Sequence, residues 1–169
     1  MRENIARPSR FIEKTSEWSC HVDGIDRAIL RRLQDDGRMT ATALAEEVGL
    51  TLAPCHRRLR ELENSGVIRG YRADVDPAKV NLAFEALVFV TLKDRLTMKD
   101  FEHEVGKIGQ IIDAQRLFGE PDFLLRVMAV DLPAYQRFYD DVLVTLPGVE
   151  KLTSTIVMKN LKSGGRLPI

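Results

Sequence analysis

The sequence predicts an α+β protein with two domains, an N-terminal winged helix-turn-helix domain and a C-terminal ferredoxin-like domain of order βαββαβ. Residues 23–65 contain three short amphipathic helical patterns, and a tight glycine-containing turn joins the last two, as in a helix-turn-helix unit. Residues 86–161 change to four strand patterns rich in β-branched and aromatic residues, interrupted by two helical patterns. The chain has 169 residues, enough for two small domains that each bury a core.

Composition and breaks in the pattern bound the organisation and the setting of the chain. Hydrophobic residues make up 44% and charged residues 30%, as in globular proteins, and the formal net charge is zero. Cys20 and Cys55 give no disulfide framework, and we find neither a secretory signal nor an apolar run of about 18 residues, so we expect a cytoplasmic protein without a membrane partner. The predicted parts are a polar arm at 1–22, the helix-turn-helix domain with its wing at 23–72, a linker at 73–85, the ferredoxin-like domain at 86–162 and a tail at 163–169.

Capping residues and apolar spacing place the helices of the first domain. Asp23, Thr40 or Thr42, and Thr51 each precede a helical pattern and carry an oxygen that can accept an amide proton of the first turn. Glycine residues end the second and third patterns. The expected elements are helices from Asp23 to Gln34, from Thr40 or Thr42 to Val48 and from Leu52 to Ser65, followed by a short strand from Val67 to Arg72.

The third helical pattern has one apolar side and one basic side. The apolar stripe is Cys55, Leu59 and Leu62, and the opposite stripe is Ala53, His56, Arg57 and Arg60. Residues 51–72 contain five arginines against two acidic residues. A small, basic helix face followed by a basic strand is typical of a DNA-reading helix and its wing, and from this stretch alone a solvated surface helix is an equally good interpretation.

The second domain is predicted to use both faces of its sheet. Its expected elements are strands at Ala86–Lys93, Ile111–Phe118, Asp122–Val130 and Val149–Leu161, with helices after Thr97 and Asp131. In the first strand, Leu87 and Phe89 point to one face, and Val88, Val90 and Leu92 point to the other. Both helices cover the same face in this topology, so the second apolar face needs a partner. We therefore expect the sheet to dimerise.

Other kinds of site are not indicated. His21, His56 and His103 lack a ligand-like spacing to one another or to the cysteines, so neither a metal nor another cofactor is expected. The sequence has no phosphate-cradling glycine-rich loop and no nucleophile elbow, so catalytic residues are not expected either. Cys55 lies on an apolar stripe, where a small core residue is a better interpretation than a redox sensor.

Several motifs follow one another in both halves of the chain. They are Val22–Asp26, Leu33–Arg38, Gly49–Thr51, Pro54–Arg57, Gly66–Tyr71, Gly119–Phe123 and Leu146–Val149. This ordered set closely resembles the Lrp/AsnC, or feast/famine, family of transcription regulators, collinearly from about residue 22 to residue 161. Within it, Gly119–Phe123 looks like the ligand-loop motif of that family, Gly-x-x-Asp followed by an aromatic residue.

The resemblance implies a DNA-binding domain joined to an amino-acid-binding regulatory domain, in homodimers that commonly assemble into octamers. It places the recognition helix at about Leu52–Ser65, with double-stranded DNA as the partner. Arginine can pair with guanine in the major groove, and hydroxyl or basic groups can contact bases and phosphates. The expected DNA-binding residues are Thr51, His56, Arg57, Arg60, Arg69 and Arg72, the last two on the DNA backbone.

The resemblance also implies a small effector, mostly an amino acid, near the turn between the second and third strands and at a subunit interface. Gly119 lets backbone amides approach a carboxylate, and Asp122 can pair with an α-ammonium group. Taken alone, Gly119–Asp122 is equally well interpreted as a tight hairpin turn. The expected effector-binding residues are Gly119, Glu120, Asp122, Thr153 and Thr155, with Ser154 as a further hydroxyl.

Two other functions are alternatives to a ligand-responsive, sequence-specific regulator. Sirohaem decarboxylases resemble the same two-domain plan and are the enzymatic alternative. His103 stands between Glu102 and Glu104, however, which is a poor setting for a carboxylated tetrapyrrole. Non-specific DNA packaging relies on bulk neutralisation of phosphates, and the zero net charge disfavours it.

Overall fold

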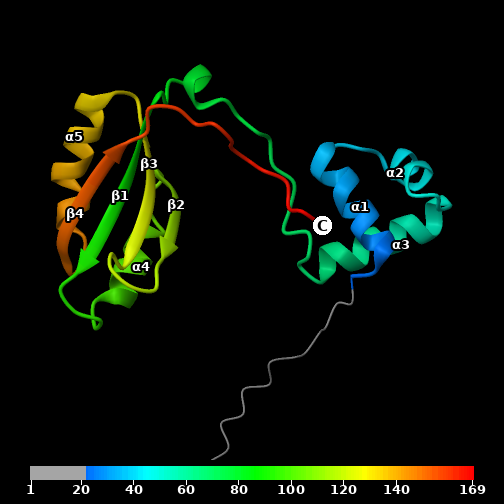
Figure 1. The fold of residues 1–169 in the computed structure, drawn as a ribbon, viewed down its shortest axis with the longest axis horizontal. Helices are drawn as coiled ribbons and strands as arrows, with labels where there is room; N and C mark the ends of the chain where they lie inside the picture. Colours follow the sequence, from blue (N-terminus) through cyan, green and yellow to red (C-terminus); the bar gives the residue numbers. More distant parts are fainter. Residues whose placement is uncertain (1–21) are drawn as a thin grey trace, which may run out of the picture. The chain divides into compact units, whose positions relative to one another are not determined.

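The computed structural model describes residues 22–169, so the polar arm predicted at 1–22 lies outside the described residues except for Val22. The described chain forms two compact units (Figure 1). The first contains the residues up to Ala73 together with Arg166–Ile169, and the second is Asp74–Gly165. None of the helices in the described part combines the length and apolarity needed to cross a membrane.

Three helices form the first unit: α1 (Gly24–Asp35), α2 (Ala41–Glu47) and α3 (Leu52–Asn64). The predicted caps of α1 and α2 are confirmed. Asp23 accepts amide protons from Ile25 and Asp26 and completes a capping box with the Asp26 side chain. Thr40, rather than Thr42, accepts the amide of Ala43.

Two predictions for the first unit were wrong. Thr51 occupies the N-cap position of α3, but its side chain makes no capping hydrogen bond. The segment Val67–Arg72, predicted to be a strand, has no regular secondary structure. A strand needs a neighbour that receives its backbone hydrogen bonds, and only Ile68 makes such a contact here, from its amide to the Leu62 carbonyl of α3 (3.0 Å).

The core of the first unit draws on all three helices. Its fully or nearly fully buried side chains are Ile29, Leu44, Ala45, Cys55 and Leu62. Cys55 is therefore a core residue, and burial in these surroundings raises the pKa of its thiol. The thiolate is the reactive form of cysteine, so this environment opposes the redox role that was the weaker interpretation.

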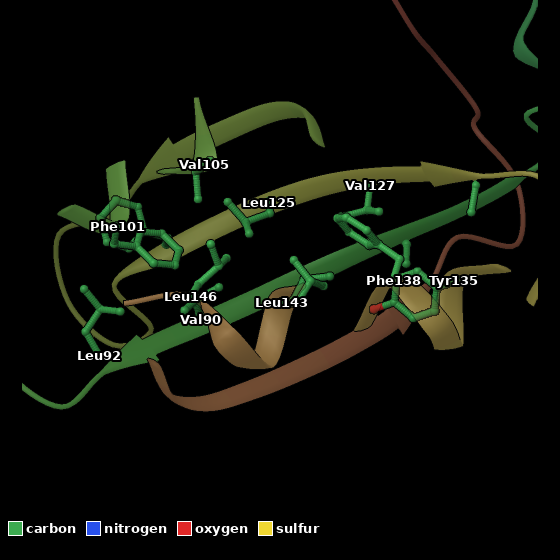
Figure 2. Close-up of a cluster of buried hydrophobic side chains, with 14 of the residues drawn as sticks. Val90, Leu92, Phe101, Val105, Leu125, Val127, Tyr135, Phe138, Leu143 and Leu146 are labelled. Atoms are coloured by element: carbon green, nitrogen blue, oxygen red, sulfur yellow. The ribbon is translucent and has the colours of Figure 1, made fainter. Parts of the chain in front are cut away.

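The second unit is a four-stranded antiparallel sheet in the order β2-β3-β1-β4, as predicted for a ferredoxin-like domain. Its strands are β1 (Phe84–Leu92), β2 (Ile111–Arg116), β3 (Phe123–Ala129) and β4 (Val149–Ile156). Its helices are η1 (Pro77–Val80), α4 (Met98–Val105), α5 (Leu132–Asp141) and η2 (Leu143–Thr145). Side chains of α4 and α5 pack on one face of the sheet, where Val90, Phe101, Leu125 and Leu143 are completely buried (Figure 2). Val88 is completely buried there too.

Several element ends differ from the predictions. β2 ends at Arg116 instead of Phe118, and β4 ends at Ile156 instead of Leu161. The pairing of β4 with β1 ends at Ile156, opposite Ala86, and one further backbone bond joins Val157 to Glu85 (3.0 Å). Thr97 precedes α4 without capping it, and its hydroxyl donates instead to the Asp94 carbonyl (3.2 Å).

The sheet face away from α4 and α5, called the open face, is mixed rather than uniformly apolar. Leu87, Phe89 and Leu124 lie on it half-buried in this single chain. Next to them, Arg126 donates to Glu85 (2.5 Å), and Asn160 donates to the second oxygen of the same carboxylate (2.7 Å). The hydrogen bond from Arg126 holds the pKa of Glu85 below its usual value, and the bond from Asn160 acts in the same direction. Burial opposes this shift only in part.

Candidate nucleic-acid interface and effector loop

Helix α3 has a buried side and an exposed side, in the arrangement predicted for a recognition helix. Cys55 and Leu62 are buried and Leu59 is half-buried against α1 and α2. The predicted reading residues His56, Arg57 and Arg60 are all exposed on the other side. The first unit therefore presents a convex, basic helix face to solvent, which is the shape that enters a DNA major groove.

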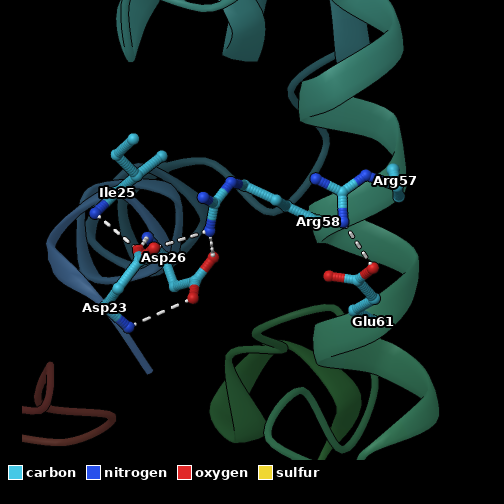
Figure 3. Close-up of polar contacts among 6 residues, drawn as sticks. All are labelled: Asp23, Ile25, Asp26, Arg57, Arg58 and Glu61. Carbon is cyan, nitrogen blue, oxygen red and sulfur yellow. Dashed lines mark hydrogen bonds and ion pairs between the residues drawn. The ribbon is translucent and has the colours of Figure 1, made fainter. Parts of the chain in front are cut away.

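Arg58 separates the two sides of α3 and fixes the helix to α1. Its Nη1 atom lies 2.8 Å from Asp23 Oδ2 and 2.9 Å from Asp26 Oδ1, the two residues of the α1 capping box (Figure 3). Only 24% of its side chain and 12% of the Asp26 side chain are exposed. Arg58 thus holds α3 in place and is not available to read DNA. Sequence reasoning missed this role because its partners lie more than 30 positions away in the chain.

The N-terminus of α3 is open towards solvent. Thr51 is exposed, and because its hydroxyl does not cap the helix, it remains available to an incoming group. The amides of Leu52 and Ala53 belong to the first turn, which has no acceptor within the helix. Unpaired amides and the positive end of the helix dipole favour an anion such as a DNA phosphate.

The three exposed basic residues of α3 differ in their pairing. Arg57 makes an ion pair with Glu61 one turn later (2.8 Å), and 65% of its side chain is exposed (Figure 3). An exposed pair of this kind is worth only about 0.3–0.5 kcal/mol, so DNA can displace Glu61 at little cost. Within residues 22–169, His56 and Arg60 make no ion pair, so both remain free for another partner.

Tyr71 lies in sequence between the two arginines that follow α3 and is held by contacts with the first unit. Its hydroxyl donates to Glu63 Oε1 (3.0 Å), and its ring lies beside Gly37 in the turn after α1. Burial, the Glu63 hydrogen bond and the Glu63 charge raise the pKa of Tyr71 to about 12, so this contact stays intact over the physiological pH range. Arg69 and Arg72, on either side, are exposed.

The predicted effector loop is tied to the end of β1. The Asp122 amide donates to the Val90 carbonyl (2.9 Å), and Asp122 Oδ2 accepts the Leu92 amide (2.8 Å). Gly119 and Glu120 are exposed, and Gly119 has a φ of 130°. One Asp122 oxygen therefore holds the loop, while the exposed backbone before it faces solvent.

The predicted hydroxyl groups on β4 do not join this loop within one chain. Thr153 and Thr155 pair with Phe89 and Leu87 of β1, so both lie on the open face. The loop leads directly into β3, and β4 lies two strand spacings, or about 10 Å, away from β3. Ser154 lies on the helix-covered face and shares a hydrogen bond with the Tyr135 hydroxyl (2.5 Å), so it serves the fold instead.

Family profiles match both units. Residues 22–69 match the profile described as winged helix-turn-helix DNA-binding. Residues 85–167 match the profile described as Lrp/AsnC ligand binding domain. The helix-turn-helix match contains Thr51 and all three exposed basic residues of α3, and the second contains the effector loop.

Known proteins are similar over nearly the whole described chain. The DNA-binding transcriptional activator DecR of Escherichia coli (strain K12) is 35% identical over 150 residues, which cover 88% of this chain and 99% of that protein. The leucine-responsive regulatory protein of Rhizobium meliloti is 36% identical over 150 residues, covering 88% and 96%. The first is named as a transcriptional activator and the second as a regulatory protein, which favours a regulator over the sirohaem decarboxylase alternative.

Solved structures agree with the sequence relatives. A transcriptional regulator of Neisseria meningitidis in complex with L-methionine has a TM-score of 0.82 at 37% identity, covering 86% of this chain and 96% of that one. A feast or famine regulatory protein of M. tuberculosis complexed with L-methionine has a TM-score of 0.78 at 30% identity, covering 84% and 95%. The chain belongs to the Lrp/AsnC family of DNA-binding transcriptional regulators.

Proposed function

We propose that this regulator reads a specific DNA sequence with the exposed face of α3. The observation that carries the proposal is the division of α3 by Arg58, which turns His56, Arg57 and Arg60 outwards as one basic surface. Arginine at such a position pairs with two acceptors of guanine in the major groove. Thr51 at the open helix end and Arg69 and Arg72 beyond α3 contact phosphates in this proposal.

A footprint on genomic fragments tests the proposal that binding is sequence-specific. Discrete protected sites at helical spacing support specific reading by a symmetric assembly. Uniform coverage that depends only on DNA length would indicate packaging and contradict the proposal.

We further propose that an amino acid binds at the loop Gly119–Asp122 and that a second copy of the chain completes the site. Support comes from the two similar regulators that were solved with L-methionine. The exposed backbone at Gly119 and Glu120 suits a carboxylate, and the Asp122 carboxylate suits an α-ammonium group. Because Thr153 and Thr155 lie two strands away in their own chain, their hydroxyls reach an effector only as part of a subunit interface.

A thermal-shift screen with the twenty amino acids tests the effector proposal, because a ligand that binds only the folded state raises the unfolding midpoint. Asp122→Asn is the matched variant, since its amide oxygen can still accept the Leu92 proton while the negative charge is lost. We expect the variant to keep the midpoint of the free protein and to lose the ligand-induced shift. If none of the twenty amino acids shifts the wild-type protein, the effector proposal is wrong.

A further inference from the structure

The first unit contains a hollow that the proposed DNA contacts leave unexplained. It has a volume of about 690 Å³ and lies between α1 and the segment after α3. Leu30 and Leu33 of α1 form one wall, and residues 67–72 form another. Leu167 and Ile169, more than 90 positions later in the sequence, line the same hollow.

Residues 166–169 (Arg-Leu-Pro-Ile), called the RLPI segment, lie against one stripe of α1. Gln34 accepts the Leu167 amide (2.6 Å) with its side-chain oxygen and approaches the Leu167 carbonyl (3.5 Å) with its side-chain nitrogen. Arg31 Nε donates to the Ile169 carbonyl (2.5 Å), and Arg166 makes an ion pair with Asp35. Residues 31, 34 and 35 are spaced i, i+3 and i+4, so they share one face of the helix.

These contacts are those of a peptide-binding groove. The side chain of Gln34 offers one acceptor and one donor, as a peptide group does, and it pairs with both backbone groups of Leu167. Backbone pairing of this kind holds an extended segment, while side-chain pockets and charges select its sequence. The selective contacts here are the apolar lining of the hollow and the Asp35 charge opposite Arg166.

Burial identifies the anchor of the segment. Residues 158–168 are all exposed, and Ile169 is the one half-buried residue after them. Residues 67–72 line the same hollow. Among the described residues, the one backbone hydrogen bond that joins this segment to a helix or strand runs from the Ile68 amide to the Leu62 carbonyl. The RLPI segment lines the hollow together with these residues and therefore supports a part of the chain that has few other contacts of its own.

We propose that the α1 stripe at the edge of this hollow is a docking groove for the chain's own RLPI segment, and that the docked segment, which lines the hollow together with residues 67–72, braces them. The groove recognises an extended peptide with a basic residue followed by two apolar residues. The inference goes beyond the proposed function, because it concerns a contact within the protein that requires neither DNA nor effector.

Exchange of the Ile68 amide proton, followed by NMR in the full chain, measures the bracing directly. In a chain that ends at Gly165, we expect this amide to exchange about tenfold faster, because residues 67–72 then lose the wall of the hollow that Leu167 and Ile169 supply. A synthetic peptide of residues 162–169, added to the shortened chain, should restore the slower rate. An unchanged exchange rate in the shortened chain would overturn the proposal.

Gln34→Ala separates docking from any general effect of shortening the chain. We expect this variant to speed exchange at Ile68 in the full chain and to add nothing in the chain that ends at Gly165. Gln136→Ala is the control, since Gln136 is an exposed glutamine on a helix of the second unit, away from the RLPI segment. Additive effects of Gln34→Ala and the deletion would contradict docking at Gln34.

A charge exchange tests the selective contact and the origin of the segment. Asp35→Arg should speed exchange at Ile68, and the added change Arg166→Asp should reverse that effect. Docking within one chain predicts rates that do not depend on protein concentration. Rates that rise on dilution would mean that the groove holds the segment of a second copy, and would contradict the proposal as stated.

Discussion

Arg57 and Arg58 are neighbours in the sequence with opposite environments, and the difference follows from where each side chain emerges on α3. Arg57 lies on the outer face and pairs with Glu61 of its own helix. Arg58 faces α1 and connects two carboxylates of its capping box. A substitution at Arg57 therefore tests DNA reading, whereas a substitution at Arg58 tests the assembly of the domain.

Arg58→Ala is expected to destabilise the first unit clearly more than Arg57→Ala. Removing Arg58 leaves two clustered carboxylates, one of them mostly buried, without their cation. Removing Arg57 loses only an exposed pair within a helix. Urea unfolding at neutral pH, followed through NMR signals of residues 24–64, provides the comparison. Equal losses for both variants would show that the α1–α3 contact contributes little.

The same contact predicts a pH dependence. The hydrogen bond from the Asp26 amide lowers the pKa of the Asp23 carboxyl below its usual value, and Arg58 lowers it further. Burial acts in the opposite direction but is the smaller effect. A lowered folded-state pKa contributes stability above the unfolded value of about 3.9, and this contribution is lost as the pH falls through the folded-state pKa. The stability difference between wild type and Arg58→Ala should therefore shrink in acid. A difference that stays constant from pH 7 to pH 2 would contradict this reading of Asp23.

Gly148 occupies a position that no larger residue fits. Its φ is +71°, and a Cβ atom there would lie 1.9 Å from Thr97 Oγ1 and 2.5 Å from Thr97 Cβ. We expect Gly148→Ala to destabilise the second unit by more than the roughly 1–3 kcal/mol that an unfavourable backbone conformation costs alone. Gly164→Ala is the control, because Gly164 has a similar φ of +59° with open space around it. Thermal unfolding of the two variants should rank Gly148→Ala as clearly the less stable, and equal midpoints would exclude the steric contribution.

At the scale of elements, the sequence predicted the helices better than the strand ends. Asp23, Thr40 and Asp131 cap their helices through contacts within three residues, so local chemistry determines where those helices begin. The end of β4 at Ile156 depends instead on where its pairing with β1 ends, at Ala86, about 70 positions earlier. Val67–Arg72 has strand-like composition but no neighbouring strand, and composition alone does not reveal a missing partner.

The candidate site shows the same difference between features set by local sequence and features set by distant contacts. The exposure of His56, Arg57 and Arg60 follows from helical periodicity, and the structure confirms it. The roles of Arg58 and Tyr71 depend on contacts with α1 and with the turn at Gly37, which no spacing along α3 indicates. The separation of Thr153 from the effector loop likewise follows from strand order and not from sequence distance.

Base reading and backbone contact predict different responses to substitution. Arg60→Ala is expected to weaken binding to the specific site by about 1–3 kcal/mol and to relax discrimination between sequences. Arg69→Ala is expected to weaken binding to all sequences alike. It should also reduce the slope of log affinity against log salt concentration by about 1, because one phosphate contact is lost. Fluorescence anisotropy at several salt concentrations measures both, with Arg95→Ala, an exposed arginine of the second unit, as the control. Identical responses of the Arg60 and Arg69 variants would reject the division of roles.

At the scale of the whole molecule, we expect the open face of the sheet to determine how many copies of α3 act together. Leu87, Phe89 and Leu124 form a small apolar patch there, and the Arg126–Glu85 pair beside it is satisfied within the chain. An apolar patch with a satisfied polar margin is the usual composition of a protein interface. A symmetric pair through this face would present two copies of α3, as a palindromic DNA site requires.

Phe89→Glu tests this arrangement, because an unpaired carboxylate in an apolar interface is costly to bury. Phe89 lies opposite Leu124 on one side and Thr153 on the other, near the middle of the sheet. We expect sedimentation velocity at micromolar concentration to find a dimer or larger assembly for the wild type and a monomer for Phe89→Glu. Gln136→Glu, on an exposed position of α5, should leave the assembly unchanged. The monomeric variant should also bind a full DNA site with much lower affinity, since it loses the second recognition helix. A wild-type protein that sediments as a monomer would refute dimerisation through the sheet.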